Sequence, residues 1–197
     1  MGGYNILDIG TGPGEFLEVV KYYKCKGIGI NPPEDHKWYD KLEPGLAEIQ
    51  DDRVKKYTHF SKINILRQKL DVLIIEMYNC FLNGNRELGK MKFNIINCQD
   101  AINLILINCY DLNFTIDHYK DKHIFGKWII DDKFYSNIEK MISFFDKILL
   151  SNGAIMLAAL ASSNDKKYSK AITDTANKYG FKVELSVNNN VHKLRKI

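Results

Sequence analysis

The sequence predicts an α/β domain in which helices cover both faces of a mostly parallel β-sheet with an antiparallel C-terminal strand. Short apolar runs, of the kind buried in parallel sheets, alternate along the chain with segments of helical period. The last two apolar runs have only Asn188-Asn189-Asn190 between them and predict an antiparallel pair. Such alternation is typical of a three-layer α/β/α sheet. The 197 residues, 45% hydrophobic and 26% charged, predict one domain over residues 1–197.

Seven apolar runs are predicted as strands, because each is short and most are bounded by turn-forming residues. In chain order they are Tyr4–Ile9, Lys26–Ile30, Val54–Phe60, Phe93–Cys98, Ala154–Leu160, Phe181–Val187 and Val191–Ile197.

The helices are predicted from apolar residues that recur at helical spacing and from the residues that end them. They are Phe16–Val20, Glu34–Ile49 with a break at Pro44-Gly45, Leu66–Phe81 ending at Asn83-Gly84, Ile102–Cys109, Phe134–Leu149 ending at Asn152-Gly153, and Tyr168–Tyr179 ending at Gly180. Within Leu66–Phe81, the run Asp71–Glu76 could also be interpreted as a strand that ends in an acidic residue. The helical period favours the helix.

A long connection from Asn113 to Asp132 shows no period and contains His118, His123 and Trp128. Long irregular connections in compact domains are often functional, so we expect a substrate-side loop here. If the substrate is RNA, Trp128 is expected to stack on an unpaired base.

The composition permits an anionic partner without requiring one, since the net charge is +4 and the pI about 8.7. Lysines gather in several places, and those nearest the carboxyl ends of the strands are expected to contact RNA phosphates. No apolar run could cross a bilayer, and no secretory signal is present. The four cysteines show no metal-ligand spacing with the histidines, which predicts free thiols, no metal site and a reducing, cytoplasmic location.

The chain is organised around the stretch Ile6–Phe16, in which an apolar strand enters a glycine-rich turn that opens a helix. Glycine lets a ligand approach the main chain, and the helix start presents free N–H groups. The turn Gly10–Gly14 lacks the third glycine of G-x-G-x-x-G, because Glu15 occupies that position, and it lacks the Gly-Lys-Ser/Thr of a P-loop. Open α/β sheets bind ligands at the carboxyl ends of their strands, where Asp8, Asn31 and 97–100 are expected.

The pattern D-x-G-x-G-P-G-x-F from Asp8 to Phe16 resembles motif I of the class I S-adenosylmethionine (SAM)-dependent methyltransferases. This resemblance implies a Rossmann-like methyltransferase fold, SAM as the cofactor, and a turn that passes under the amino-acid end of SAM. The implied cofactor-binding residues are Asp8, Gly10, Thr11, Gly12, Pro13, Gly14, Phe16, Asn31, Asn64, Asn97, Cys98 and Gln99, with Asp100 as the catalytic candidate. Asn31 stands where many relatives place an acid that holds the ribose.

Two subfamilies resemble segments of the chain. Phe93–Asn103 is similar to the fourth-strand motif of mRNA cap guanine-N7 methyltransferases of the poxvirus type, although Asp100 replaces Phe and Asn103-Leu104 replaces His-Tyr. The FtsJ-like ribose 2′-O-methyltransferases are similar around Pro13–Phe16 and Gly27–Ile30. Their catalytic lysine, which would fall near Ala158 or Ala159, is missing. Transfer to guanine N7 needs no general base.

The resemblance therefore implies a SAM-dependent methyltransferase that acts on RNA, is cap-related and is viral. Two alternatives stay open: a catalytically degenerate methyltransferase fold that serves as a binding or stimulatory subunit, and a small-molecule methyltransferase. Methyltransferases usually carry residues ahead of the first strand, so we also expect a domain cut from a longer chain, with a partner domain or subunit supplying the missing N-terminal elements.

Overall fold

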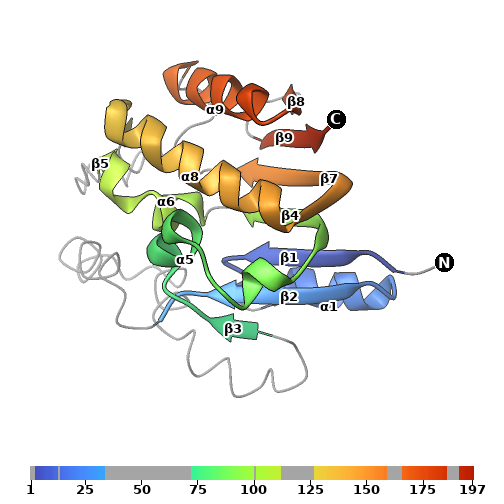
Figure 1. Ribbon diagram of the computed structural model, residues 1–197. Coiled ribbons are helices and arrows are strands. Elements are labelled where there is room, and N and C mark those ends of the chain that lie inside the picture. Colours follow the sequence, from blue (N-terminus) through green and yellow to red (C-terminus); the bar gives the residue numbers. More distant parts are fainter. Residues whose placement is uncertain are drawn as a thin grey trace, which may run out of the picture.

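The computed structural model describes residues 3–12, 14–33, 72–99, 101–111, 127–158, 166–185 and 191–197 (Figure 1). Its main feature is a seven-stranded sheet with the order β3-β2-β1-β4-β7-β9-β8. These strands are β1 (Asn5–Ile9), β2 (Lys26–Asn31), β3 (Val72–Ile74), β4 (Phe93–Gln99), β7 (Leu149–Ala158), β8 (Phe181–Leu185) and β9 (Val191–Lys196). The pairs from β3 to β7 are parallel, and β9 lies antiparallel between β7 and β8. The predicted α/β sheet with an antiparallel C-terminal strand is confirmed.

Helices lie on both faces of this sheet. They are α1 (Glu15–Tyr22), α5 (Met77–Asn83), α6 (Ile102–Ile105), α8 (Asp132–Ile148) and α9 (Lys166–Lys178), with short 3-10 helices η1 (Leu88–Lys90) and η2 (Ile107–Cys109). Helix α1 packs on one face, where a Cβ on Gly27 or Gly29 would touch Leu17. Helices α5 and α8 pack against each other on the opposite face (Figure 1).

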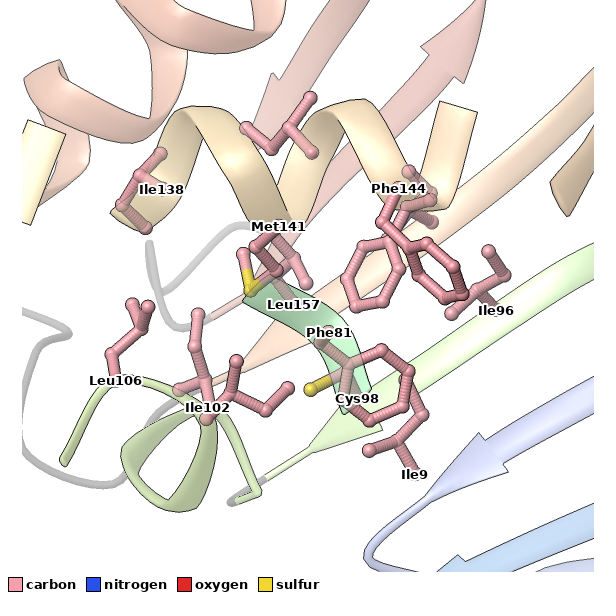
Figure 2. Close-up of a cluster of buried hydrophobic side chains, with 14 of the residues drawn as sticks. Ile9, Phe81, Ile96, Cys98, Ile102, Leu106, Ile138, Met141, Phe144 and Leu157 are labelled. Carbon is pink, nitrogen blue, oxygen red and sulfur yellow. The ribbon is translucent and has the colours of Figure 1, made fainter. Parts of the chain in front are cut away.

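The core fills the space between the sheet and α8. Asp131 caps this helix by accepting a hydrogen bond from the Phe134 N–H at 2.8 Å, and every third or fourth residue after it is buried. Figure 2 shows Met141 of α8 and Phe81 of α5 packed over Ile9 and Ile96 of the sheet. None of the described helices is long and apolar enough to span a membrane.

The predicted helix Leu66–Phe81 is wrong in its described part. Val72–Ile74 is strand β3, paired in parallel with β2, and only Met77–Asn83 is helical. The β-branched residues Val72 and Ile74 suit a strand, and β2 supplies the backbone partners. The predicted third strand, Val54–Phe60, lies outside the described residues.

The junction between α8 and β7 also differs from the prediction. The helix ends at Ile148, the strand begins at Leu149, and Asn152-Gly153 lies inside the strand. The pairing with β4 moves from Phe93↔Leu149 to Ile95↔Ala154, so β7 carries extra residues there. Asn152 takes a φ of 64°. The Asn-Gly pair therefore lies at a shift of register within the strand and does not end the helix.

Trp128 belongs to the core. It lies in β6 (Lys127–Trp128), which pairs with β5 (Tyr110–Asp111), and only 5% of its surface is exposed. Its ring stacks on Tyr168 at a centroid distance of 5.1 Å and meets the edge of Phe134 at 5.6 Å. The prediction that it stacks on an RNA base is wrong. The last part of the predicted loop is therefore regular structure, since Lys127–Trp128 is a strand, Asp131 caps α8 and Asp132 begins it, while residues 113–126 lie outside the described residues.

Candidate functional site at the carboxyl edge of the sheet

The carboxyl ends of β1, β2 and β4 bring together the polar residues that follow these strands in the sequence. Asp8 is level with Gly29 of β2 and with Asn97 of β4 in the parallel register. Asn31 is the last residue of β2, and Gln99 is the last of β4. Asp8, Asn31 and Asn97 therefore lie at one edge of the sheet, as expected.

The glycine turn that follows β1 is fastened to the end of β2. The amides of Gly10 and Thr11 both donate to the Ile30 carbonyl, at 2.8 and 3.0 Å. Gly10, Gly12 and Gly14 have φ angles of 74°, 50° and 81°, in the region that side chains disfavour. A Cβ on Gly10 would also lie 2.5 Å from the Cβ of Ala101. Glycine is thus required at Gly10 by both conformation and packing.

The Asn31 side chain makes two hydrogen bonds to Gly12, in the middle of this turn. Its side-chain oxygen accepts from the Gly12 N–H at 2.9 Å, and its amide nitrogen donates to the Gly12 carbonyl at 3.1 Å. The side chain is 3% exposed. A ribose contact here would come from the Asn31 backbone or be weak, because both polar atoms of the side chain already bond Gly12.

A chain of hydrogen bonds runs from β1 to the end of β4. The Asn97 amide donates to Asp8 Oδ1 at 2.7 Å, and the Gln99 amide donates to the side-chain oxygen of Asn97 at 3.1 Å. Burial raises the pKa of Asp8, and the hydrogen bond from Asn97 opposes that rise. Asp8 is 3% exposed and Gln99 is exposed, so the chain leads from the interior to the surface of this edge.

Helix α1 begins directly after the turn, with Gly14 as its N-cap. The first intrahelical hydrogen bond runs from the Glu18 N–H to the Gly14 carbonyl, so the amides of Glu15, Phe16 and Leu17 precede it. The predicted site residue Phe16 is 39% exposed on the outer face of the helix.

The remaining predicted site residues divide into two groups. Cys98 is buried, and Figure 2 shows its side chain in the core cluster, so any ligand contact there would come from its backbone. Pro13, Asn64 and Asp100 lie outside the described residues.

Burial keeps two of the cysteine thiols from ionising. All four are free thiols, as predicted. Burial and the nearby Glu76 raise the pKa of Cys80 to about 12. Burial raises the pKa of Cys109, whose sulfur accepts a hydrogen bond from Asn137 at 3.3 Å. Among the described residues, no cluster of His, Cys, Asp and Glu could hold a metal ion.

Glu76 is an acidic residue at this edge that the sequence prediction set aside. It follows β3 by two residues and caps α5, accepting from the amides of Tyr78 and Asn79 at 3.0 and 2.6 Å. The apolar run Val72–Ile75 followed by an acid was the signal that could have placed it at a strand end.

Comparisons with known proteins agree on the fold. No protein-family model and no curated protein matches the chain. A methyltransferase from Pyrococcus furiosus is similar in structure, with a TM-score of 0.50 and 16% identity over 98% of this chain and 74% of that one. A precorrin-6y C5,15-methyltransferase from Geobacter metallireducens has a TM-score of 0.47 and 12% identity, over 99% of this chain and 81% of that one. A SAM-dependent methyltransferase from Archaeoglobus fulgidus has a TM-score of 0.47 and 14% identity, over 93% of this chain and 65% of that one. The Pyrococcus structure shows that the fold is a Rossmann-like methyltransferase fold.

Proposed function

We propose that this chain is a SAM-dependent methyltransferase. The observation that carries the proposal is the glycine turn after β1, whose residues Gly10, Thr11 and Gly12 are hydrogen-bonded to β2 at the carboxyl edge of a sheet with a methyltransferase fold. Ligands bind at that edge in open α/β sheets. The pattern D-x-G-x-G-P-G-x-F from Asp8 to Phe16 resembles motif I, and this resemblance points to SAM as the ligand.

The donors at this edge fit SAM in a specific way. The amides of Gly10, Thr11 and Gly12 are bonded to β2, so they hold the turn in shape. The amides of Glu15 to Leu17 lie at the positive end of α1, where a carboxylate such as that of SAM is favoured. Asp8 and Gln99 offer acceptors to an ammonium group. SAM would supply an electrophilic methyl group attached to a positively charged sulfur.

We further propose that the methyl acceptor is RNA, with guanine N7 of a cap as the first candidate. At this edge Asn97 and Gln99 are amides, which cannot remove a proton at neutral pH, while the carboxyl of Asp8 is buried against Asn97 and that of Glu76 caps α5. Guanine N7 carries a lone pair and no proton, so correct alignment with the methyl group is sufficient. The similarity of Phe93–Asn103 to the cap N7 enzymes supports this choice.

A binding or stimulatory subunit is the second candidate, and one observation favours it. Both polar atoms of Asn31 are bonded to Gly12, and the side chain has no carboxylate with which to accept from two ribose hydroxyls as an acid does in many relatives. SAM affinity is then lower than in such relatives, and a chain that keeps the fold for another purpose is the natural rival.

Calorimetric titration with SAM and S-adenosylhomocysteine tests the cofactor. Wild type is expected to bind both. Gly12→Val is expected to abolish binding, because a branched side chain does not suit a φ of 50° at a residue that Asn31 holds by hydrogen bonds. Gly89→Val is the matched control, since a Cβ there would meet no atom within 4 Å. Absence of binding to folded wild type would refute the proposal.

Transfer of labelled methyl groups tests the acceptor. Capped RNA, uncapped RNA and a metabolite extract would be offered in parallel with labelled SAM. Labelling of capped RNA alone is expected. Labelling of a metabolite instead would establish the small-molecule alternative, and SAM binding without transfer to any acceptor would favour the stimulatory subunit.

A further inference from the structure

The amino edge of the sheet, opposite the candidate site, carries a band of exposed lysines. We call Lys21, Lys24, Lys26, Lys92 and Lys147 the amino-edge band. Lys26 begins β2, Lys92 immediately precedes β4, and Lys147 comes two residues before β7. Lys21 and Lys24 lie at the end of α1. Figure 1 shows this edge on the side of the two chain ends, with the arrowheads of the parallel strands pointing away from it.

The band is continuous because the strands that carry it are neighbours. Their order is β2-β1-β4-β7, and three strand spacings cover about 14 Å. The Lys92 ammonium group donates to the backbone carbonyl of Lys147, which ties two members together. The Lys26 amide donates to the Tyr4 carbonyl at 2.9 Å and so fixes Tyr4 beside the first strand ends.

Among the described residues, the acids nearest in sequence to Lys21 and Lys147 do not neutralise them. Asp146, next to Lys147, is already paired with Lys196 at 2.6 Å. The acids of α1, Glu15 and Glu18, lie in its first turn, towards the opposite edge. The helix dipole accounts for a lysine in the last turn of α1. It does not account for Lys26 and Lys92, which belong to strand ends.

Three exposed tyrosines accompany the lysines. Tyr4, Tyr22 and Tyr23 are 60%, 81% and 71% exposed, values that packing does not explain. The rings of Tyr22 and Tyr23 meet edge to face at 5.3 Å. Exposed aromatic rings beside a positively charged track are what single-stranded nucleic acid requires, because bases stack on the rings while phosphates meet the lysines.

We propose that the amino-edge band, with Tyr4, Tyr22 and Tyr23, binds single-stranded nucleic acid. The exposed rings favour this partner over an anionic lipid surface, for which lysines alone would suffice. The surface is separate from the methyl-transfer edge and does not depend on SAM binding. It is a different surface from the lysines near the carboxyl ends of the strands, whose expected RNA contact stays a prediction.

Fluorescence anisotropy with a labelled 16-nucleotide oligo(U) tests the surface. The test variant is Lys21→Glu/Lys26→Glu/Lys147→Glu, and the matched control is Lys133→Glu/Lys166→Glu/Lys170→Glu, at the starts of α8 and α9. Each variant changes the net charge from +4 to −2. The test variant is expected to bind about tenfold or more weakly than the control, and the slope of log K against log salt is expected to fall by about 2.

The tyrosines provide a second measurement that leaves the charge unchanged. Tyr22→Ser/Tyr23→Ser should weaken oligo(U) binding about fivefold or more. Tyr135→Ser, at an exposed position of α8, should leave it unchanged. The proposal would be overturned if the two lysine variants lost the same affinity for oligo(U), or if the tyrosine variant bound as wild type does. It would also be overturned if wild type did not bind oligo(U), or bound phosphatidylserine vesicles more tightly. SAM titration of the same variants tests the proposed function separately.

Discussion

Asn31→Asp is the substitution that best tests how the glycine turn is held. The side chain keeps its shape, and one oxygen can still accept from the Gly12 N–H. The amide nitrogen that donates to the Gly12 carbonyl at 3.1 Å becomes a second oxygen, so two acceptors face each other in a position that is 3% exposed.

The cost follows from that geometry. Leaving the Gly12 carbonyl unpaired costs about 1–3 kcal/mol, and each unit by which burial raises the pKa of the new carboxyl adds about 1.4 kcal/mol at neutral pH. We expect the free energy of unfolding at pH 8 to fall by about 2–4 kcal/mol. A raised pKa in the folded state means that the folded protein holds the proton more tightly. Stability is then lost as pH rises from the unfolded value towards the folded one, so the defect should be smaller at pH 5, where the protonated carboxyl can donate to Gly12.

Urea unfolding at pH 5 and pH 8, with SAM titration at both, measures these effects. Asn94→Asp is the control, since the Asn94 oxygen accepts from the Asn5 N–H and an Asp retains that acceptor. SAM affinity of the Asn31 variant should fall at least tenfold at pH 8, because the turn is no longer held by both hydrogen bonds. Tighter SAM binding would show that this side chain reaches the ribose as the acid of many relatives does. It would refute the claim that its two hydrogen bonds to Gly12 hold the turn.

Three further substitutions have defined outcomes. Gly10→Ala should destabilise the protein by about 2–4 kcal/mol in urea unfolding, and adding Ala101→Gly should recover part of the loss, because the two Cβ atoms would be 2.5 Å apart. Trp128→Ala should cost about 3–5 kcal/mol as a core truncation, while the folded variant should bind oligo(U) as wild type does. Asp8→Asn should make the protein more stable at pH 7 and remove the loss of stability that occurs as pH rises through the raised pKa of Asp8, while SAM titration should show weaker binding.

The parts of the fold that could be predicted are those set by local sequence. The stretch from β1 through the turn and α1 to β2 was predicted because its glycines, apolar runs and helix start are neighbours in the chain. Strand β3 was not predicted, since three residues carry no period of their own and depend on the edge of β2. Trp128 was assigned to a surface loop because its strand has two residues, and its partners Tyr110 and Tyr168 are distant in sequence.

The same distinction applies to the candidate site. That Asp8, Asn31 and Asn97 would lie at one edge followed from the rule for parallel strands. That Asn97 bonds Asp8 depends on the register between β1 and β4, which places together residues 89 positions apart. The bonds from Asn31 to Gly12 depend on the path of the turn, and no spacing in the sequence encodes them.

The polar chain of Asp8, Asn97 and Gln99 is difficult to explain by stability alone. A carboxyl group that is 3% exposed costs free energy, as its raised pKa indicates, and the hydrogen bond from the Asn97 amide offsets that cost only in part. Apolar residues at the ends of β1 and β4 would pack against the same core without a desolvation cost. Departures from local consistency of this kind concentrate at functional sites. The position of this one, beside the turn Gly10–Gly14 and ending at an exposed glutamine, is therefore an independent reason to place ligand binding at the carboxyl edge of the sheet.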